Sequence, residues 1–355
     1  MSERELLEHT VQAIMREHCP PELVASAEGS WNRPLWDQLA GAGLTAVGVA
    51  EDLDGSGGDL ADAALVLGVV SAHAGPVPLG ETLFPAAAGC AAAGLAMPAD
   101  PVTVAFGPSL SVTRDGTGIV LDGVVARVPY ARVADWVLMC GQTDGTEVAV
   151  LVDPAMLTLA AGDNLAGEPR DDVAVSRLRL SSDAVAELPP GTVARLQRFG
   201  ALARSVQIAG ALGAVLELTV RYAGEREQFG RPIGHFQAVA HQVATLAGLV
   251  AASGAAADAA VASVMRSDDA GDGSAALAVA AAKARTSAAA GPAARIAHQV
   301  HGAIGFTQEH RLHHLTRRLW SWRDEYGSEQ HWAAELGRAA ITAGAGEFWP
   351  TITRT

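Results

Sequence analysis

The stretch that decides the fold lies at residues 221–237 and reads RYAGEREQFGRPIGHFQ. Apolar residues recur at three- and four-residue spacing through residues 194–225, which predicts a long helix that ends inside this stretch. A glycine and a proline near its middle favour a turn, because glycine accepts a left-handed backbone and proline cannot continue a helix. The turn would present the guanidinium of Arg226 beside the ring of Phe229, which suits a phosphate next to a flat ring.

Helical patterns of the same period occupy both ends of the chain. The Asp- and Gly-rich residues 268–273 contain no large apolar residue, so they are expected to connect two helices. The expected helices cover Arg4 to His18, Leu35 to Ala42, Asp59 to Ala74, Ala194 to Glu225, Ile233 to Met265, Ser274 to Phe306, and His310 to Gly344 with breaks.

The middle of the chain has a different pattern. From Pro101 to about residue 188 the apolar period changes to two, which is typical of half-buried strands. Asp-Gly pairs at positions 115, 122 and 144 are expected to form hairpin turns. The expected strands are 102–106, 110–113, 118–121, 133–140 and 148–152.

Together these patterns predict a mainly α chain with a central, antiparallel β domain. The expected division is an N-terminal helical domain at 1–100, the β domain at 101–190 and a C-terminal four-helix bundle at 191–355. With 355 residues and 49% hydrophobic composition, such a chain can bury several cores without disulfides or metals.

Composition and charge exclude several classes of function. The net charge of −14 disfavours nucleic acid and anionic membranes as partners. Three cysteines far apart in the sequence indicate neither a disulfide framework nor a metal site, and favour a reducing cytoplasm. The acidic start of the chain and the charges within its apolar stretches predict neither a targeting signal nor a membrane span.

The charge is unevenly distributed along the chain. Residues 1–190 hold 9 arginines against 26 acidic residues, whereas residues 191–355 hold 15 arginines and Lys283 against 13 acidic residues. An anionic ligand is therefore expected to bind the second half.

The histidines at 298, 301, 310, 313 and 314 raise the possibility of a metal site. His310 and His314 would share one helix face at i, i+4 spacing, as in helical zinc motifs. No third ligand stands at a useful position, and neighbouring arginines would repel a cation, so no metal is expected.

Two motifs give the chain a family resemblance. The first contains Tyr222, Arg226, then Phe229-Gly230, and a Gln237 that begins the next helix. The second, QVHGAIGFTQEH at residues 299–310, looks like a Gln-x-x-Gly-Gly-x-Gly-Phe segment. With the order of helical, β and helical blocks, these motifs resemble the acyl-CoA dehydrogenase family over nearly the whole chain.

The resemblance implies FAD as cofactor and an acyl-CoA thioester as substrate. In that family the matching residues reach across a subunit interface to the neighbour's FAD, so at least a dimer and an electron-transfer acceptor are also implied. The backbone N–H groups around Gly302 and Gly305 would be open to phosphate oxygens. The implied FAD-binding residues are Arg226, Phe229, Gln237, Gln299, Gly302 and Ser328.

The family's catalytic base is missing from its usual place. That position, counted without gaps from the second motif, holds Tyr326, and the alternative family position holds Ala203. A phenol is almost fully protonated at neutral pH and cannot readily replace a carboxylate. Glu325 is one residue away, but one residue turns a helical side chain by about 100°. Asp324 is two residues away, and a slip of one residue would bring in Glu325, which is therefore the candidate catalytic base.

The residues with which a family member contacts the flavin bound to its own chain have also changed. The family's Thr-Glu-Pro-x-Ala-Gly-Ser-Asp loop has no counterpart between Val102 and Val120, and Arg127-Val-Pro129 replaces a later aromatic-x-Thr contact. The chain thus keeps residues that would serve a neighbour's cofactor and lacks those that would serve its own. This pattern is similar to the companion subunit of heteromeric actinobacterial acyl-CoA dehydrogenases.

Three hypotheses follow from the sequence. The favoured one is an acyl-CoA dehydrogenase subunit that lacks its own base and contributes to a shared FAD site in a hetero-tetramer with a related chain. The second is a self-sufficient homo-dimer or homo-tetramer that uses Glu325. The third is a degenerate fold that binds an acyl thioester or a protein without redox chemistry.

Overall fold

The computed structural model describes residues 2–116, 118–267, 273–307, 310–344 and 346. By their contacts the residues group into two compact units. Unit 1 comprises Met1–Ser26, Ala64–Gly75 and Ala201–Thr355, and unit 2 comprises Ala27–Ala63 and Pro76–Gly200. The division into three consecutive domains stays a prediction, and each unit is described by itself. The connection expected at 268–273 falls almost entirely outside the described residues.

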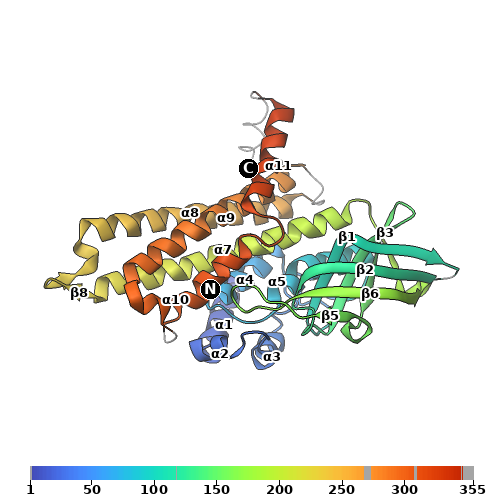
Figure 1. The fold of residues 1–355 in the computed structure, drawn as a ribbon, viewed down its shortest axis with the longest axis horizontal. Coiled ribbons are helices and arrows are strands. Elements are labelled where there is room, and N and C mark those ends of the chain that lie inside the picture. Colours follow the sequence, from blue (N-terminus) through green and yellow to red (C-terminus); the bar gives the residue numbers. More distant parts are fainter. Residues whose placement is uncertain (1, 117, 268–272, 308–309, 345, 347–355) are drawn as a thin grey trace. The chain divides into compact units, whose positions relative to one another are not determined.

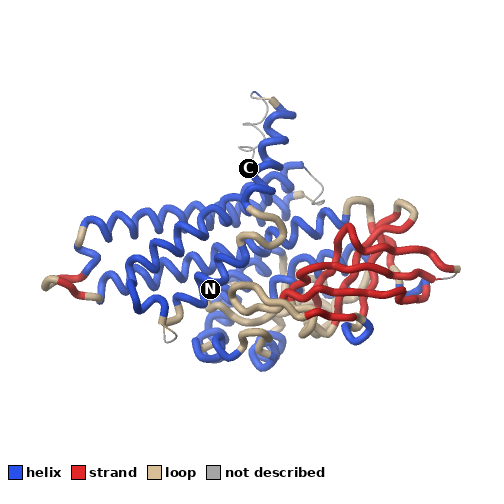
Figure 2. The backbone as a smooth tube through the Cα atoms, viewed as in Figure 1, coloured by secondary structure: helices blue, strands red, loops and turns tan. Residues whose placement is uncertain are grey.

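Unit 1 is helical (Figures 1 and 2). The long helices α8 and α9 pack against each other, and α10 and α11 both contact α9. The expected range His310 to Gly344 is broken as predicted, and forms α10 and α11 on either side of a non-helical segment at residues 323–328. The sequence patterns did not predict α2, and α9 ends at His301, before the expected Phe306. The helices are α1 (Glu3–His18), α2 (Pro21–Ser26), α4 (Leu60–Ala72), α7 (Thr192–Glu225), α8 (Gln237–Arg266), α9 (Gly273–His301), α10 (Leu312–Trp322) and α11 (Glu329–Ala343). The first residues of α4 and α7 belong to unit 2.

Between α7 and α8 lies a two-stranded hairpin, β8 (Glu227–Gln228) with β9 (Arg231–Pro232). It occupies the turn that the sequence predicts there. Gly210 brings α7 close to α4, because a Cβ at this position would overlap the backbone of Gly68.

Unit 2 is built around a seven-stranded sheet with the order β5-β6-β2-β1-β3-β4-β7. Its helices are α3 (Arg33–Gly41), α5 (Leu79–Glu81) and α6 (Ala87–Ala93), the last two joined by a π-helical turn. Gly89 of α6 lies directly over Leu138, so that α6 covers one face of the sheet. The strands are β1 (Val102–Asp115), β2 (Gly118–Pro129), β3 (Trp136–Thr143), β4 (Thr146–Val152), β5 (Thr158–Ala160), β6 (Arg170–Ser181) and β7 (Ala186–Leu188).

The expectation of an antiparallel sheet is wrong at one pair of strands. β1 and β3 run parallel, with Val102 opposite Trp136 and Phe106 opposite Cys140. After β2 returns along β1, the chain crosses to the opposite edge of β1 and runs in the same direction as β1. A period of two reports which side chains are buried and carries no information about strand direction.

The Asp-Gly pairs behave in two ways. Asp115-Gly116 lies at the β1–β2 turn, and Asp144-Gly145 forms the β3–β4 turn with φ of 50° and 80°. Asp122-Gly123 makes no turn, contrary to expectation. It lies inside β2 at a register shift, and the expected strand 110–113 is part of one long strand β1.

Candidate functional site

The segment between α10 and α11 carries the position of the missing base. Glu325 accepts a hydrogen bond from Nε of Arg204 on α7, with 2.7 Å between Nε and Oε2. The Arg204 side chain is 1% exposed and that of Glu325 is 12% exposed. The carboxylate is therefore engaged by a buried cation, which stabilises its ionised form and makes it a poor acceptor for a substrate proton.

Tyr326 occupies a strained backbone position next to this ion pair. Its φ is +53°, in the left-handed region that a residue other than glycine adopts only at a cost. The guanidinium of Arg204 lies 5.3 Å from the centre of the Tyr326 ring, within range of a cation–π contact. Nε1 of Trp332 donates to the Tyr326 carbonyl at 3.0 Å. Arg204 thus contacts both Glu325 and Tyr326, which ties this segment to α7.

Lys283, a buried residue of α9, holds the same segment from the other side. Its ammonium donates to the carbonyls of Arg323 and Gly327 at 2.8 and 2.9 Å, and to Oγ of Ser287 at 2.9 Å. The Ser287 hydroxyl donates its own proton to the Arg323 carbonyl, so all three Lys283 contacts need a lysine proton. Burial lowers the pKa of Lys283 to about 7.

Ser328, expected to contact FAD, begins α11. Its hydroxyl accepts from the backbone N–H of His331 at 3.3 Å, as the N-cap of that helix. This bond fixes the end of the segment that carries Glu325 and Tyr326.

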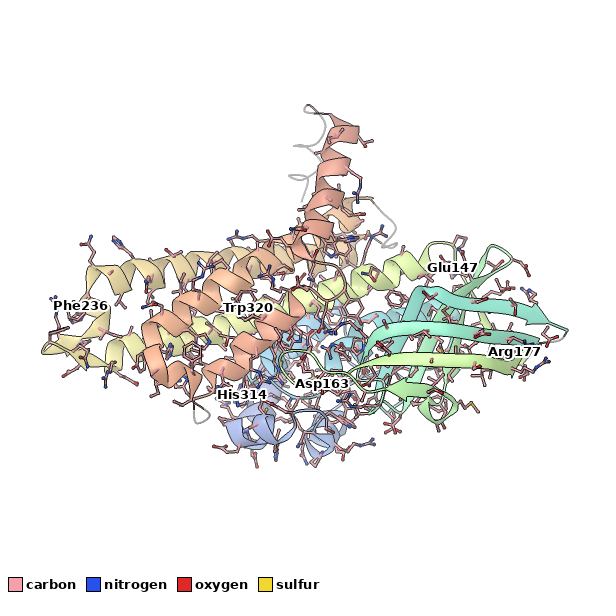
Figure 3. All side chains as sticks on the ribbon, viewed as in Figure 1. Glu147, Asp163, Arg177, Phe236, His314 and Trp320 are labelled. Atoms are coloured by element: carbon pink, nitrogen blue, oxygen red, sulfur yellow. The ribbon has the colours of Figure 1, made fainter. Side chains whose placement is uncertain are left out.

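The first sequence motif forms an exposed corner of unit 1 at the β8–β9 hairpin. Phe229 and Gly230 form its turn with φ of 52° and 78°, and the Phe229 side chain is 93% exposed. Phe229 therefore does not pack into the bundle, and its ring lies nearly perpendicular to that of Phe236, with 6.1 Å between ring centres. Phe236 lies at the same end of unit 1 as the hairpin (Figures 1 and 3).

The second sequence motif lies where α9 ends. Gly302 has a φ of +62°, and a Cβ added there would meet no atom within 4 Å. The space beside Gly302 is therefore open, whereas Gly305, expected to share the phosphate cradle, is buried against His301 and Leu312. Gln299, one turn earlier on α9, is also exposed.

A stacked pair of rings joins the two motifs. Tyr222 at the end of α7 lies against His301 at the end of α9, with ring centres 4.6 Å apart. The expected FAD-binding residues of both motifs therefore belong to the same region of unit 1. Exposed there are Arg226, Phe229, Gln237, Gln299 and Gly302.

The histidines near this region contact aromatic and polar neighbours. His298 stacks on Phe306 at 4.1 Å and bonds Thr316 through Nε2 at 2.9 Å. Burial lowers the pKa values of His298, His301 and His310, so these side chains are neutral at physiological pH. Within the described residues, no group of three or more metal-binding side chains is placed to hold an ion.

Sequence reasoning missed the network around the segment. In the sequence, Arg204 is only the neighbour of Ala203, which stands at the family's alternative base position. Lys283 is notable there only as the one lysine of the chain. A lone lysine inside a run of alanines was the available signal, because an unpaired charge is costly on an apolar helix face.

Comparisons with known proteins match most of the chain to one family. Models of the acyl-CoA dehydrogenase N-terminal and C-terminal domains match residues 1–94 and 195–339. A relative named acyl-CoA dehydrogenase IpdE2, from Mycolicibacterium smegmatis, is 31% identical over 315 residues, which covers 87% of this chain and 90% of the relative. The chain belongs to the acyl-CoA dehydrogenase family.

Other relatives and solved structures extend the comparison. The Mycobacterium tuberculosis protein of the same name is 30% identical over 88% of this chain and 89% of its own length. A chain of the ChsE4–ChsE5 complex from M. tuberculosis superposes with a TM-score of 0.87 at 24% identity, covering 97% of this chain and 99% of that one. The Tcur3481–Tcur3483 steroid acyl-CoA dehydrogenase gives 0.86 at 24% identity, covering 96% of this chain and 99% of that one. These superpositions confirm the fold expected from the sequence.

Proposed function

We propose that this chain is the companion subunit of a heteromeric, FAD-dependent acyl-CoA dehydrogenase and provides residues for FAD seated mainly in a related chain. The observation that carries the proposal is the pairing of Glu325 with buried Arg204. The only carboxylate next to the family's base position is already bound by a cation. We expect the base to come from the partner chain and the complex to work in the cytoplasm.

The exposed corner of unit 1 fits the phosphate and ring groups of FAD. A guanidinium at Arg226 can bind a pyrophosphate, Phe229 has an exposed ring, and the space beside Gly302 is open. Gln237 and Gln299 add exposed amide side chains that can donate and accept hydrogen bonds.

In the reaction, FAD would accept the hydride from the β carbon of the acyl thioester while a base removes the α proton. The residues of this chain would bind and orient the dinucleotide and would hold no proton of the substrate. One structural neighbour is described as a steroid acyl-CoA dehydrogenase and another as a complex of two named proteins, so a polycyclic acyl-CoA is the substrate class to test first.

Purification of the chain alone and together with a related chain tests the proposal. Alone, we expect a nearly colourless protein, inactive with acyl-CoA and an artificial electron acceptor. With a partner that carries the missing flavin loop and base, we expect yellow colour and activity. Arg226→Ala should then lower the FAD content, whereas Arg338→Gln on α11 should not.

Two outcomes would support the other hypotheses. A yellow, active homo-oligomer that loses activity on Glu325→Gln would show a self-sufficient dehydrogenase. FAD content that is unaffected by Arg226→Ala and Phe229→Ala would favour a binding protein without redox chemistry.

A further inference from the structure

Unit 1 contains a cavity of about 510 Å³ that the flavin corner and the Glu325 segment do not line. Its walls come from α1, α4, the middle and end of α7, and the residue just before α10. All of these segments belong to the same compact unit. The volume lies in the range of binding sites for small molecules.

Three arginines from three different segments line this cavity: Arg16, Arg221 and Arg311. The lining contains one carboxylate, Glu217, so two positive charges are not compensated. Within the described part of the chain, none of the three guanidinium groups forms an ion pair within 4.0 Å. Three converging guanidinium groups without carboxylate partners are the donor set that binds an anion.

Arg311 is the best positioned of the three. It is half-buried, and one of its terminal nitrogens donates to the carbonyl of Ala72 at 3.3 Å. That bond uses one N–H of a group that has five, which leaves donors for a ligand. Arg16 and Arg221 are exposed and mark the mouth of the cavity.

His73, which also lines the cavity, experiences the positive field of the arginines. Its pKa falls to about 4, first through burial and then through the charges of Arg311 and Arg16. The side chain is therefore neutral at physiological pH and leaves the anion to the arginines.

The remaining wall is apolar and offers free space. Val69, Ala72 and Leu218 contribute aliphatic surface. A Cβ added to Gly213 would meet no atom within 4 Å, although the residue lies inside helix α7. A bound molecule would therefore combine an anionic group at the arginines with a hydrocarbon body along α4 and α7.

We propose that this cavity binds a small organic anion, a carboxylate or phosphate ester on a short hydrocarbon body, and that Arg16, Arg221 and Arg311 recognise the anionic group. The site is separate from the residues proposed for FAD, so its test needs no activity measurement and does not depend on the proposed function.

Calorimetric titration of the full chain with three probes that share one hydrocarbon body tests the recognition. Octanoate and octyl phosphate should each bind at one site per chain, and octan-1-ol should bind at least about tenfold more weakly. Raising the salt concentration to about 0.5 M should weaken the binding of the two anions and leave the binding of octan-1-ol unchanged. Equal affinity for octanoate and octan-1-ol would overturn the proposal, and stronger binding of one anion would identify the head group.

Variants of the lining locate the binding. Arg221→Gln should weaken octanoate binding about tenfold, and Glu217→Gln should strengthen it. Gly213→Leu should abolish binding by filling the space beside this residue, where an added Cβ meets no neighbouring segment within 4 Å. The matched controls are Arg338→Gln and Gly337→Leu, both on exposed positions of α11.

The control variants Arg338→Gln and Gly337→Leu should bind octanoate with the affinity of the wild type. Octanoate that binds equally well to wild type, Arg221→Gln and Gly213→Leu would bind elsewhere, and the proposal would be wrong. Because Arg221 is exposed, its variant remains informative even if Gly213→Leu fails to fold.

Discussion

At the residue scale, Lys283 links a buried charge to the segment that carries Tyr326. In the folded chain its pKa is about 7, whereas the unfolded chain keeps the ordinary value of about 10.5. Between these values the unfolded state binds one more proton than the folded state, so the free energy of unfolding rises with pH. The buried ammonium of Lys283 thus lowers the free energy of unfolding below pH 7, and this destabilisation diminishes as the pH rises.

Lys283→Met should remove this dependence. The free energy of unfolding of wild type, minus that of the variant, should rise with pH above 7, and the slope should approach about 1.4 kcal/mol per pH unit by pH 8.5. Denaturant titrations at four pH values measure it. The buried thiols of Cys19 and Cys90, with pKa values raised to about 11, titrate alike in both proteins and cancel in the difference. If the difference in the free energy of unfolding did not change with pH, Lys283 would keep its ordinary pKa in the folded chain.

A second prediction at this scale concerns Phe229. Its φ of +52° is strained for any residue other than glycine, and its side chain is 93% exposed. Phe229→Gly should therefore raise the free energy of unfolding of the isolated chain by about 1 kcal/mol. In the complex with a related chain the same variant should lower the FAD content, because the ring is lost.

Stability of the isolated chain and FAD content of the complex measure the two effects of Phe229→Gly. Gly230→Ala, at φ +78° in the same turn, is the reverse control and should destabilise the chain while keeping the ring. A Phe229→Gly variant that is less stable than wild type would show that the ring stabilises the isolated chain.

At the scale of elements, the bulge in β2 depends on a single glycine. A Cβ at Gly123 would overlap the carbonyl oxygen of Ser109 on β1, and the φ of 135° is strained for other residues. Gly123→Ala should therefore lower the free energy of unfolding by at least about 2 kcal/mol. Gly145→Ala, at φ +80° in an open turn, should cost only about 1 kcal/mol. Thermal unfolding of both variants gives the comparison, and equal costs would mean that the strands separate to accommodate the methyl group.

The same two glycines show how far the sequence could predict the elements. Both follow an aspartate, and local chemistry alone predicts a turn at each. Whether the chain turns or bulges is decided by the strand opposite, which lies outside any local window. The β8–β9 turn was predictable because its glycine and proline act on their own backbone.

The residues of the candidate site were also predictable only in part. Exposed residues such as Arg226 and Gly302 stood out through motifs, because a ligand contact needs a fixed spacing of residue types. The pairing of Arg204 with Glu325, 121 positions apart, depends on helix packing that spacing does not determine. The parallel pairing of β1 with β3 was hidden for the same reason.

At the scale of the whole molecule, α8 differs from the other long apolar helix. Both α7 and α8 are long and apolar enough to cross a membrane by composition alone. The most apolar window is 72% buried in α7 and 28% buried in α8. A lysine-free helix with so much accessible apolar surface is expected to pack against another chain.

The exposed face of α8 indicates how that packing would occur. Ala244, Gly248, Ala251 and Ala255 are all exposed and follow one another at spacings of four, three and four residues, which puts them on one side of the helix. Small residues on one face allow two helix backbones to approach closely. We therefore expect α8 to contact a second chain, either another copy or a related subunit.

Ala255→Glu should disrupt that contact, because it buries a carboxylate between two helices without a partner. Purified alone or with a related chain, the wild-type protein should have a mass of at least twice 36.4 kDa by light scattering, and the variant should be largely a 36.4 kDa monomer. Ala334→Glu adds the same charge to an exposed position of α11 and should leave the mass unchanged. An assembly that withstands Ala255→Glu would place the subunit contact on another surface and remove α8 from the interface.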